Sequence, residues 1–144
     1  MIILVIRISG YILLNVILFI MEKIRSHKEL RVFKLAFDIA QEIFRISKEF
    51  PQIEKYSLTD QIRRSSRSVA ANIAEAFRMR RYPNAFISKL NQSEGESAET
   101  QVWLEFAEAC DYITSTVREE LNTSYEQILG MLVNMIHNPE KWKV

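Results

Sequence analysis

Glycine and proline are scarce in this sequence, with three residues of each among 144. Sheets joined by tight turns depend on these two residues, so their scarcity argues against a β protein and favours long helices. The one cysteine excludes an internal disulfide and favours a reducing compartment. We therefore predict an all-α, cytoplasmic protein, and its length is that of a single domain.

Residues that carry catalysis or bind metals are also few. The two histidines, His27 and His137, stand near opposite ends of the chain, and neither has cysteine or carboxylate partners at metal-ligand spacing. The serines of residues 65–68 lack a nearby base, and no glycine-rich phosphate loop occurs. Cys110 fits a role as a small apolar packing residue. We predict no catalytic activity, no metal site and no cofactor.

Charge is distributed unevenly, although the net charge is only +1. Residues 21–81 contain fourteen Lys or Arg and eight Asp or Glu, whereas residues 82–144 contain four and ten. Such asymmetry indicates either a basic binding face or two halves that pair with each other. The sequence leaves both interpretations open.

An apolar segment, residues 1–20, precedes residues 21–144, which we assign to the bundle domain. As a helix this segment would be about 30 Å long, enough to span a bilayer. It is interpreted as a mis-assigned translation start before Met21, as a membrane anchor, or as a signal peptide, although no cleavage site follows it. As an anchor it would be followed by basic residues, which keep the domain in the cytoplasm. A membrane partner is expected only in that case.

Four stretches with helical apolar periodicity follow. The first covers roughly residues 28–49. The second begins near Ser57, where "SLTD" has the form of a capping box. The third covers Pro83 to Tyr112, and the fourth begins near Thr116 as N-cap. Because the connections are short, we predict an antiparallel up-down four-helix bundle with an extra apolar N-terminal segment.

Two of these stretches carry more apolar surface than packing against one neighbouring helix requires. The first has a row with Phe33, Phe37 and Phe44 beside a row with Val32, Ala36 and Ile43, which indicates contact with more than one neighbour. The third has a second apolar face that contains Val102, Phe106 and Ala109. It also contains Gly95, which costs about 1 kcal/mol relative to alanine inside a helix. We expect the glycine to allow a close approach to the small residues of the second helix.

Six arginines lie within "QIRRSSRSVAANIAEAFRMRR", residues 61–81. If the second and third helices fold back on each other at Tyr82, residues whose numbers sum to about 164 lie side by side. That register makes three oppositely charged or polar matches: Glu75 with Lys89, Arg67 with Glu96 or Ser97, and Arg64 with Glu99 or Thr100. We predict a structural polar seam formed by Arg64, Ser68, Asn72, Glu75, Glu96 and Glu99. Exposed ion pairs in it would each contribute less than about 1 kcal/mol.

Arg78, Arg80 and Arg81 crowd the end of the second helix, whereas Arg63 lies on its outer side with Arg67 one turn later. The next acidic residue lies more than ten positions past the turn, which leaves positive potential uncompensated. Such a cluster suits phosphates, and the adjacent tyrosine can stack on a base. An ordinary solvated turn is the alternative. The candidate nucleic-acid contacts are Arg63, Arg67, Arg78, Arg80, Arg81 and Tyr82.

The segments "LTDQIRRSSRSVAANIAEAF", "FISKL" and "ESAETQVWLE" resemble the four-helix-bundle family of bacterial proteins encoded in intervening sequences of large-subunit ribosomal RNA. "HKELRVFKLAFDIAQEIFRISKEFP" is similar to the first helix of that family. The resemblance covers residues 28–136, which favours Met21 as the start. Ala76 stands where most members have glycine, and this departure puts the geometry of the helix end in question. The family's motif residues fall on Arg64, Ser68, Asn72, Ala74 and Glu75.

This resemblance implies an antiparallel four-helix bundle and no established catalytic activity. A related protein, the accessory factor of diversity-generating retroelements, is a ring-shaped homopentamer that binds nucleic acid and a reverse transcriptase. The resemblance therefore implies a homo-oligomer, a pentamer, with RNA or DNA and a reverse transcriptase as candidate partners. That factor is strongly basic, whereas this chain is nearly neutral, which weakens the transfer of the nucleic-acid role.

We predict a non-enzymatic four-helix-bundle adaptor that self-associates and contacts RNA or DNA through basic patches. The alternative is a structural or protein-interaction module without nucleic-acid binding.

Overall fold

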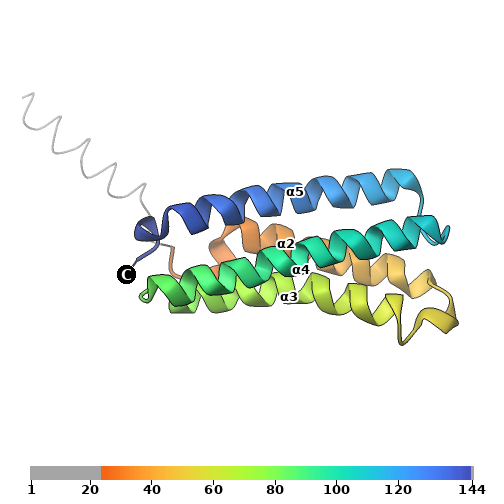
Figure 1. The fold of residues 1–144 in the computed structure, drawn as a ribbon, viewed down its shortest axis with the longest axis horizontal. Helices are drawn as coiled ribbons and strands as arrows, with labels where there is room; N and C mark the ends of the chain where they lie inside the picture. The colour runs from red at the N-terminus through yellow and green to blue at the C-terminus, as the bar shows by residue number, and fades with distance from the viewer. Residues whose placement is uncertain (1–23, 144) are drawn as a thin grey trace, which may run out of the picture.

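The computed structural model describes residues 24–143, so the predicted roles of residues 1–20 lie outside the described part of the chain. Within residues 24–143, four long α-helices run antiparallel to their neighbours and no strand occurs (Figure 1). The helices are α2 (Arg31–Ile46), α3 (Leu58–Met79), α4 (Pro83–Ala109) and α5 (Ser115–His137). The predicted all-α, up-down four-helix bundle is confirmed.

Short 3-10 turns flank these helices. η1 (His27–Glu29) precedes α2, η2 (Ser47–Glu49) and η3 (Gln52–Glu54) connect α2 to α3, and η4 (Pro139–Lys141) follows α5. The first predicted helix is therefore one α-helix with a 3-10 turn at either end. Among residues 24–143, none of the helices combines the length and the apolar character that crossing a lipid bilayer demands.

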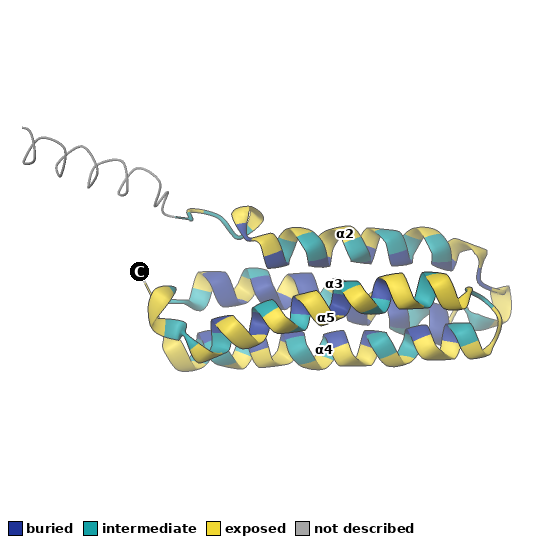
Figure 2. Ribbon diagram, turned by 90° about the horizontal axis from the view of Figure 1, so that it is seen from above, coloured by how far each residue is buried: buried dark blue, intermediate teal, exposed yellow. Residues whose placement is uncertain are grey.

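The four helices form a closed square in cross-section. α3 packs most extensively on α4, α4 also packs on α5, and α2 completes the square by contacting α3 and α5. Seen from above, α2 and α4 therefore occupy opposite corners of the bundle, with their exposed sides turned away from each other (Figure 2). The exposed surface of α2 and the exposed surface of α4 are therefore well separated from each other.

The core follows the predicted helical periodicity on α3, α4 and α5. The predicted inner residues Ile62, Val69, Ile73 and Phe77 of α3, Phe86, Leu90 and Leu104 of α4, and Leu121, Ile128, Leu132 and Met135 of α5 are all buried. On α2, the phenylalanines of the first predicted row lie at the edge of the core, although Ala40 of the same row is buried. Val32, Ala36 and Ile43 are buried, whereas Phe37 is 47% exposed. The phenylalanines therefore lie at the side of the bundle.

Hydroxyl groups fill the middle of the contact between α3 and α4. The Ser93 hydroxyl donates to the Val69 carbonyl oxygen at 2.9 Å, and the hydroxyls of Ser65 and Thr100 lie 2.8 Å apart. All three hydroxyl-bearing side chains are buried. These contacts fit the predicted register of the two helices, with residue numbers that sum to about 164.

Gly95 does not have the predicted role in this contact. It lies on the exposed side of α4, and a Cβ atom there would meet nothing within 4 Å. The buried Ser93 and Ser97, each two positions away, provide the close approach instead. The expectation for Gly95 was wrong because the inner face of α4 runs through the serines.

The start of α3 is capped differently from the prediction. Ser57 is the N-cap, but its side chain makes no capping hydrogen bond, so the predicted capping box with Asp60 does not form. The Glu54 carboxylate takes that place: it accepts the Leu58 amide N–H at 3.2 Å and also accepts the Ser57 hydroxyl. A carboxylate at a helix N-terminus is stabilised by the free amides and the helix dipole.

The turn between α4 and α5 also differs from the prediction. α4 ends at Ala109, and Thr114 rather than Thr116 caps α5 by accepting the Val117 amide N–H at 3.3 Å. The early end of α4 leaves Cys110 exposed at the C-cap, so its predicted packing role was wrong. Asp111 follows in a left-handed conformation, with φ of 59°, which turns the chain sharply.

Candidate nucleic-acid interface

Two of the six candidate contacts, Arg63 and Arg67, lie one turn apart on α3 and contact α2. Arg63 Nε donates to the buried Ser47 hydroxyl at 2.7 Å, and its guanidinium lies 4.9 Å from the centre of the Phe44 ring. The Arg67 guanidinium lies 5.2 Å from the same ring. Both arginines therefore make cation–π contacts within the molecule. Arg63 is half-buried, and Arg67 is exposed.

Arg80 also has a partner inside the molecule. Its Nη1 donates to the Phe77 carbonyl oxygen at 2.5 Å, and its guanidinium lies 3.8 Å from the centre of the Phe77 ring. Burial lowers the pKa of Arg80, and the charges of Arg78 and Arg81 lower it further. The three guanidinium groups thus repel one another, and an anion bound among them would reduce this repulsion.

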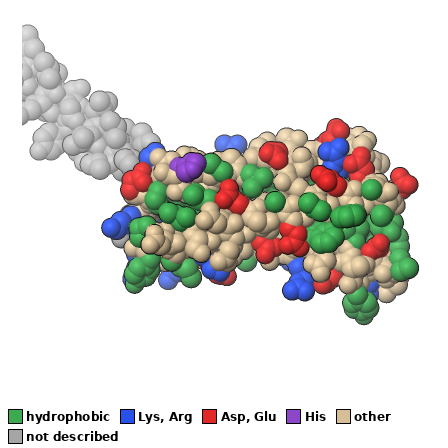
Figure 3. Space-filling model, viewed as in Figure 1, with side chains coloured by type: hydrophobic (Ala, Val, Ile, Leu, Met, Phe, Trp, Pro, Cys, Tyr) green, Lys and Arg blue, Asp and Glu red, His purple; other side chains and the backbone are tan. Residues whose placement is uncertain are grey.

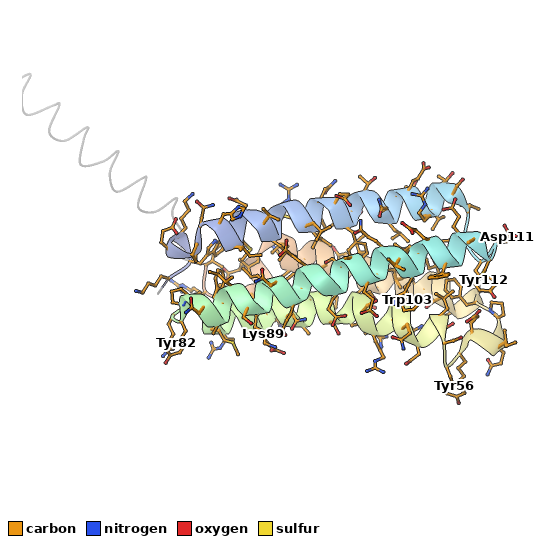
Figure 4. All side chains as sticks on the ribbon, viewed as in Figure 1. Tyr56, Tyr82, Lys89, Trp103, Asp111 and Tyr112 are labelled. Atoms are coloured by element: carbon orange, nitrogen blue, oxygen red, sulfur yellow. The ribbon has the colours of Figure 1, made fainter. Side chains whose placement is uncertain are left out.

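Arg78, Arg81 and Tyr82 are the exposed members of the set. Neither arginine forms an ion pair with another residue of the described part of the chain. Tyr82 is the N-cap of α4, is followed by Pro83 in the first helical turn, and is 63% exposed. Figure 4 shows Tyr82 at the end of the bundle where α3 turns into α4. Two exposed cations and an exposed aromatic ring therefore lie within residues 78–82, at the turn between α3 and α4.

The same end of the bundle gathers cations from distant parts of the chain. α2 begins there and α5 ends there (Figure 1), and η1 contacts α3 while η4 contacts α4. We call this the basic end. Its cations are Arg25, Lys28, Arg31, Arg78, Arg80, Arg81, Lys141 and Lys143, and its acidic residues are Glu29 and Glu140.

Sequence distance hides this grouping, because Lys28 and Lys141 are far from the arginine cluster along the chain. A signal was nevertheless available. In an up-down bundle, the start of the first helix and the end of the last helix lie beside the turn between the second and the third. Adding the charges of those two segments to the arginine cluster would have found the basic end.

The predicted polar seam between α3 and α4 forms only in part. Lys89 Nζ lies 2.6 Å from the Glu75 carboxylate, as predicted. Arg64 instead lies 3.6 Å from Asp60 on its own helix, and its side chain is 73% exposed. With Arg67 turned toward α2, the other two predicted ion pairs do not form among the described residues.

The other residues of the predicted seam have surroundings that differ from the predicted ion pairs. Glu99 accepts the Trp103 indole N–H at 3.0 Å, a contact within α4. Burial raises the pKa of Glu96, the neighbouring Glu99 raises it further, and Arg64 opposes the rise. Asn72 is buried and Ser68 is half-buried. The serine and threonine hydroxyls hold α3 and α4 together in the middle, so the longer charged side chains lie outside the contact.

Fold and surface together define an antiparallel helical bundle with exposed arginines and a tyrosine at one end. Among residues 24–143, no group of three or more His, Cys, Asp or Glu side chains is placed to hold a metal ion. The family model described as "23S rRNA-intervening sequence protein" matches residues 28–134. The chain belongs to this family, and the predicted resemblance is confirmed.

One solved structure supports the same assignment. It is a protein from Bacteroides thetaiotaomicron VPI-5482 described as having unknown function and belonging to the S23 ribosomal protein family. It is 32% identical to this chain with a TM-score of 0.67, and the match covers 74% of this chain and 95% of that chain. No curated protein matches the chain.

Proposed function

We propose that the protein is a non-enzymatic adaptor that self-associates and contacts RNA or DNA through its basic end. The observation that supports this most is the exposed group of Arg78, Arg81 and Tyr82, with both arginines unpaired among the described residues. RNA is the first ligand to test, because the family description refers to intervening sequences of 23S rRNA.

The chemistry of these side chains suits a nucleic-acid strand. A guanidinium presents a planar fork of donors that matches two phosphate oxygens. Each phosphate that it neutralises releases condensed counterions, which makes the affinity fall steeply with salt. The exposed ring of Tyr82 can stack on an unpaired base, a contact worth about 1–3 kcal/mol and tolerant of sequence.

Self-association would strengthen such contacts without new chemistry. One basic end offers only a few phosphate contacts, so a single copy would bind weakly at physiological salt. Several basic ends in one particle raise the effective concentration at which the second and later contacts form. A reverse transcriptase as a further partner stays a prediction, as does a pentameric assembly.

The alternative function is a protein-interaction module that does not bind nucleic acid. One observation favours it: Arg63, Arg67 and Arg80 make contacts within the molecule, so half of the six predicted contacts already have a role in the fold. The nearly neutral net charge of +1 also limits long-range attraction of polyanions.

Binding of single-stranded RNA at several salt concentrations separates the two functions. The test variant is Arg78→Ala with Arg81→Ala, and the matched control is Lys55→Ala with Arg64→Ala. Both variants remove two exposed cations, but the control residues lie toward the opposite end of the bundle. We expect the test variant to weaken binding and to reduce the slope of log affinity against log salt by about 2, while the control keeps the native slope.

Two results would contradict the proposal. The first is no RNA or DNA binding even at low salt, which would favour the protein-interaction module. The second is an equal loss in both variants, which would show that binding follows overall charge and not the basic end.

A further inference from the structure

An apolar strip runs along the exposed side of α4. Gly95, Ala98, Val102 and Phe106 fall on one face of this helix, and Val102 and Phe106 are 45% and 53% exposed. We call these four residues the ridge. Figure 3 shows hydrophobic side chains gathered on this side of the molecule, with acidic side chains beside them. Nothing inside the described part of the chain requires a glycine at position 95.

A groove of matching character opens between α2 and α3 on the other side of the bundle. It has a volume of about 400 Å³ and is lined mainly by phenylalanine and alanine, with Arg67 at its wall. The rings of Phe33 and Phe37 stack with their centres 6.1 Å apart. The apolar lining consists of Phe33, Phe37, Ala40, Ala70, Ala71 and Ala74.

The two surfaces have opposite charge. Between Lys89 and Arg118 the chain contains six acidic residues and no lysine or arginine. Two of those acids, Glu99 and Glu105, flank the ridge on either side and are exposed. The groove instead has Arg67 in its wall and Arg63 one turn away along α3.

These charges decide which surfaces can meet. A contact between two ridges would place carboxylates against carboxylates, and a contact between two grooves would place guanidinium groups together. Like charges brought together across a contact are unfavourable. Only a ridge against a groove pairs opposite charges. The groove runs along residues 33–41 of α2 for about 12 Å, and the ridge runs along residues 95–106 of α4 for about 16 Å, so the ridge is long enough to cover the groove.

We propose that the ridge of one copy of this chain seats in the groove of a second copy. This inference rests on the proposed self-association and names the surfaces that carry it. Because α2 and α4 lie at opposite corners, the contact is head to tail, and each pair keeps one free ridge and one free groove (Figure 2). Such a contact adds further copies until a ring closes or a filament grows.

Three substitutions to glutamate test this contact with identical charge changes. Ala71→Glu places a carboxylate in the groove, Phe106→Glu places one on the ridge, and Val133→Glu is the control on α5. All three positions are exposed, so the fold should tolerate each change, which circular dichroism would verify. Sedimentation velocity of the full chain over a range of concentrations then reports the assembly state.

We expect the native chain and Val133→Glu to assemble alike, and the other two variants to weaken assembly at least tenfold. The decisive sample is an equimolar mixture of Ala71→Glu and Phe106→Glu. The first variant keeps an intact ridge and the second an intact groove, so the mixture should form one-to-one dimers that do not grow further.

The outcomes distinguish failure of this inference from failure of the proposed function. A native chain that stays monomeric at all concentrations would overturn both the self-association and the contact. Native assembly that persists in Ala71→Glu or Phe106→Glu would overturn the contact alone. If both variants are monomeric and their mixture also stays monomeric, the contact is not head to tail and the inference fails.

Discussion

The hydroxyls of Ser65 on α3 and Thr100 on α4 share a hydrogen bond of 2.8 Å in the buried middle of the bundle. The Thr100 hydroxyl also lies 2.8 Å from the Glu96 carbonyl oxygen of its own helix. A hydroxyl has one proton and two lone pairs, so Thr100 can donate to the carbonyl and accept from Ser65. Sliding one helix along the other would leave both hydroxyls buried without this partner. The pair therefore fixes the alignment of α3 and α4.

Thr100→Val tests this pair with little change of shape. It would leave the buried Ser65 hydroxyl with only the Ile62 carbonyl oxygen, which is 3.5 Å away. We expect the free energy of unfolding to fall by about 1–2 kcal/mol, measured by urea denaturation at one fixed protein concentration.

The double variant Ser65→Ala with Thr100→Val is the control for this prediction. Because it removes both partners, its loss should be smaller than the sum of the two single losses. Strictly additive losses would show that the two hydroxyls do not stabilise each other.

Removal of the Tyr125 hydroxyl on α5 should not lower the free energy of unfolding, in contrast to the loss expected for Thr100→Val. The residue is 0% exposed, and its hydroxyl has no hydrogen-bond partner in the described part of the chain. Burial raises its pKa and the nearby Thr100 hydroxyl opposes the rise without meeting hydrogen-bond geometry, so the Tyr125 hydroxyl stays protonated at neutral pH. Tyr125→Phe should therefore leave the free energy of unfolding unchanged or raise it by up to about 1 kcal/mol. Thermal unfolding of the two proteins would measure this.

The ring of Tyr125, in contrast, should be essential for stability. Tyr125→Ala removes a large buried side chain and should lower the free energy of unfolding by about 3–5 kcal/mol. A loss of more than 1 kcal/mol in Tyr125→Phe would contradict the prediction and would mean that the hydroxyl has a partner after all.

Most of the fold was predictable because burial on a helix follows side-chain spacing. The inner faces of α3 and α5 and the two ends of the inner face of α4 follow from apolar periodicity, whereas the middle of α4 buries the polar residues Ser93, Ser97 and Thr100. On α2, the two apolar rows were indistinguishable by spacing, and only packing decides that Ala36 is buried and Phe37 is 47% exposed. Gly95 shows the same limit, since composition cannot say which side of a helix a glycine occupies.

The candidate site was predictable to a smaller extent. The register that pairs α3 with α4 was correct, yet the chemistry at its centre is hydroxyl pairing and not ion pairing. Arginine side chains are long and can turn to several neighbours. Arg63 and Arg67 reach Phe44 on α2. The predicted register compared only α3 with α4, so it could not predict these contacts. The cytoplasmic location and the assignment of residues 1–20 stay predictions.

Arg63 should behave as a structural residue. Its Nε donates to the buried Ser47 hydroxyl at 2.7 Å, and hydrogen bonds to charged groups contribute about 1.5–3 kcal/mol. We therefore expect Arg63→Ala to lower the free energy of unfolding by about 1–2 kcal/mol and to leave the salt slope of RNA binding close to native. Arg78→Ala should do the reverse, because Arg78 is exposed and unpaired among the described residues. If Arg63→Ala lowers the salt slope as much as Arg78→Ala does, Arg63 contacts phosphate, and its assignment as a purely structural residue is wrong.

The Glu54 carboxylate lies at the far end of the bundle from the arginine cluster. It accepts hydrogen bonds from the start of α3 and from the turn between α4 and α5. It accepts the Ser57 hydroxyl and the Leu58 amide N–H at the start of α3, and its other oxygen accepts the Tyr112 hydroxyl at 3.1 Å. The hydrogen bonds from Ser57 and Leu58 lower the pKa of Glu54. The ionised carboxylate thus holds the α2–α3 connection against the α4–α5 turn, near Tyr112 in Figure 4.

A lowered pKa in the folded state makes this contribution depend on pH. It is fully present above the unfolded-state pKa of about 4.3 and is lost as the pH falls through the lower folded-state pKa. Glu54→Gln should therefore have a lower Tm than the native protein at pH 7, and the difference should shrink as the pH falls below about 4. Glu49→Gln, at an exposed carboxylate of η2 with no ion pair among residues 24–143, is the control and should follow the native protein at both pH values. A Tm difference for Glu54→Gln that stays constant between pH 7 and pH 3 would show that the side chain acts through packing, because packing does not titrate.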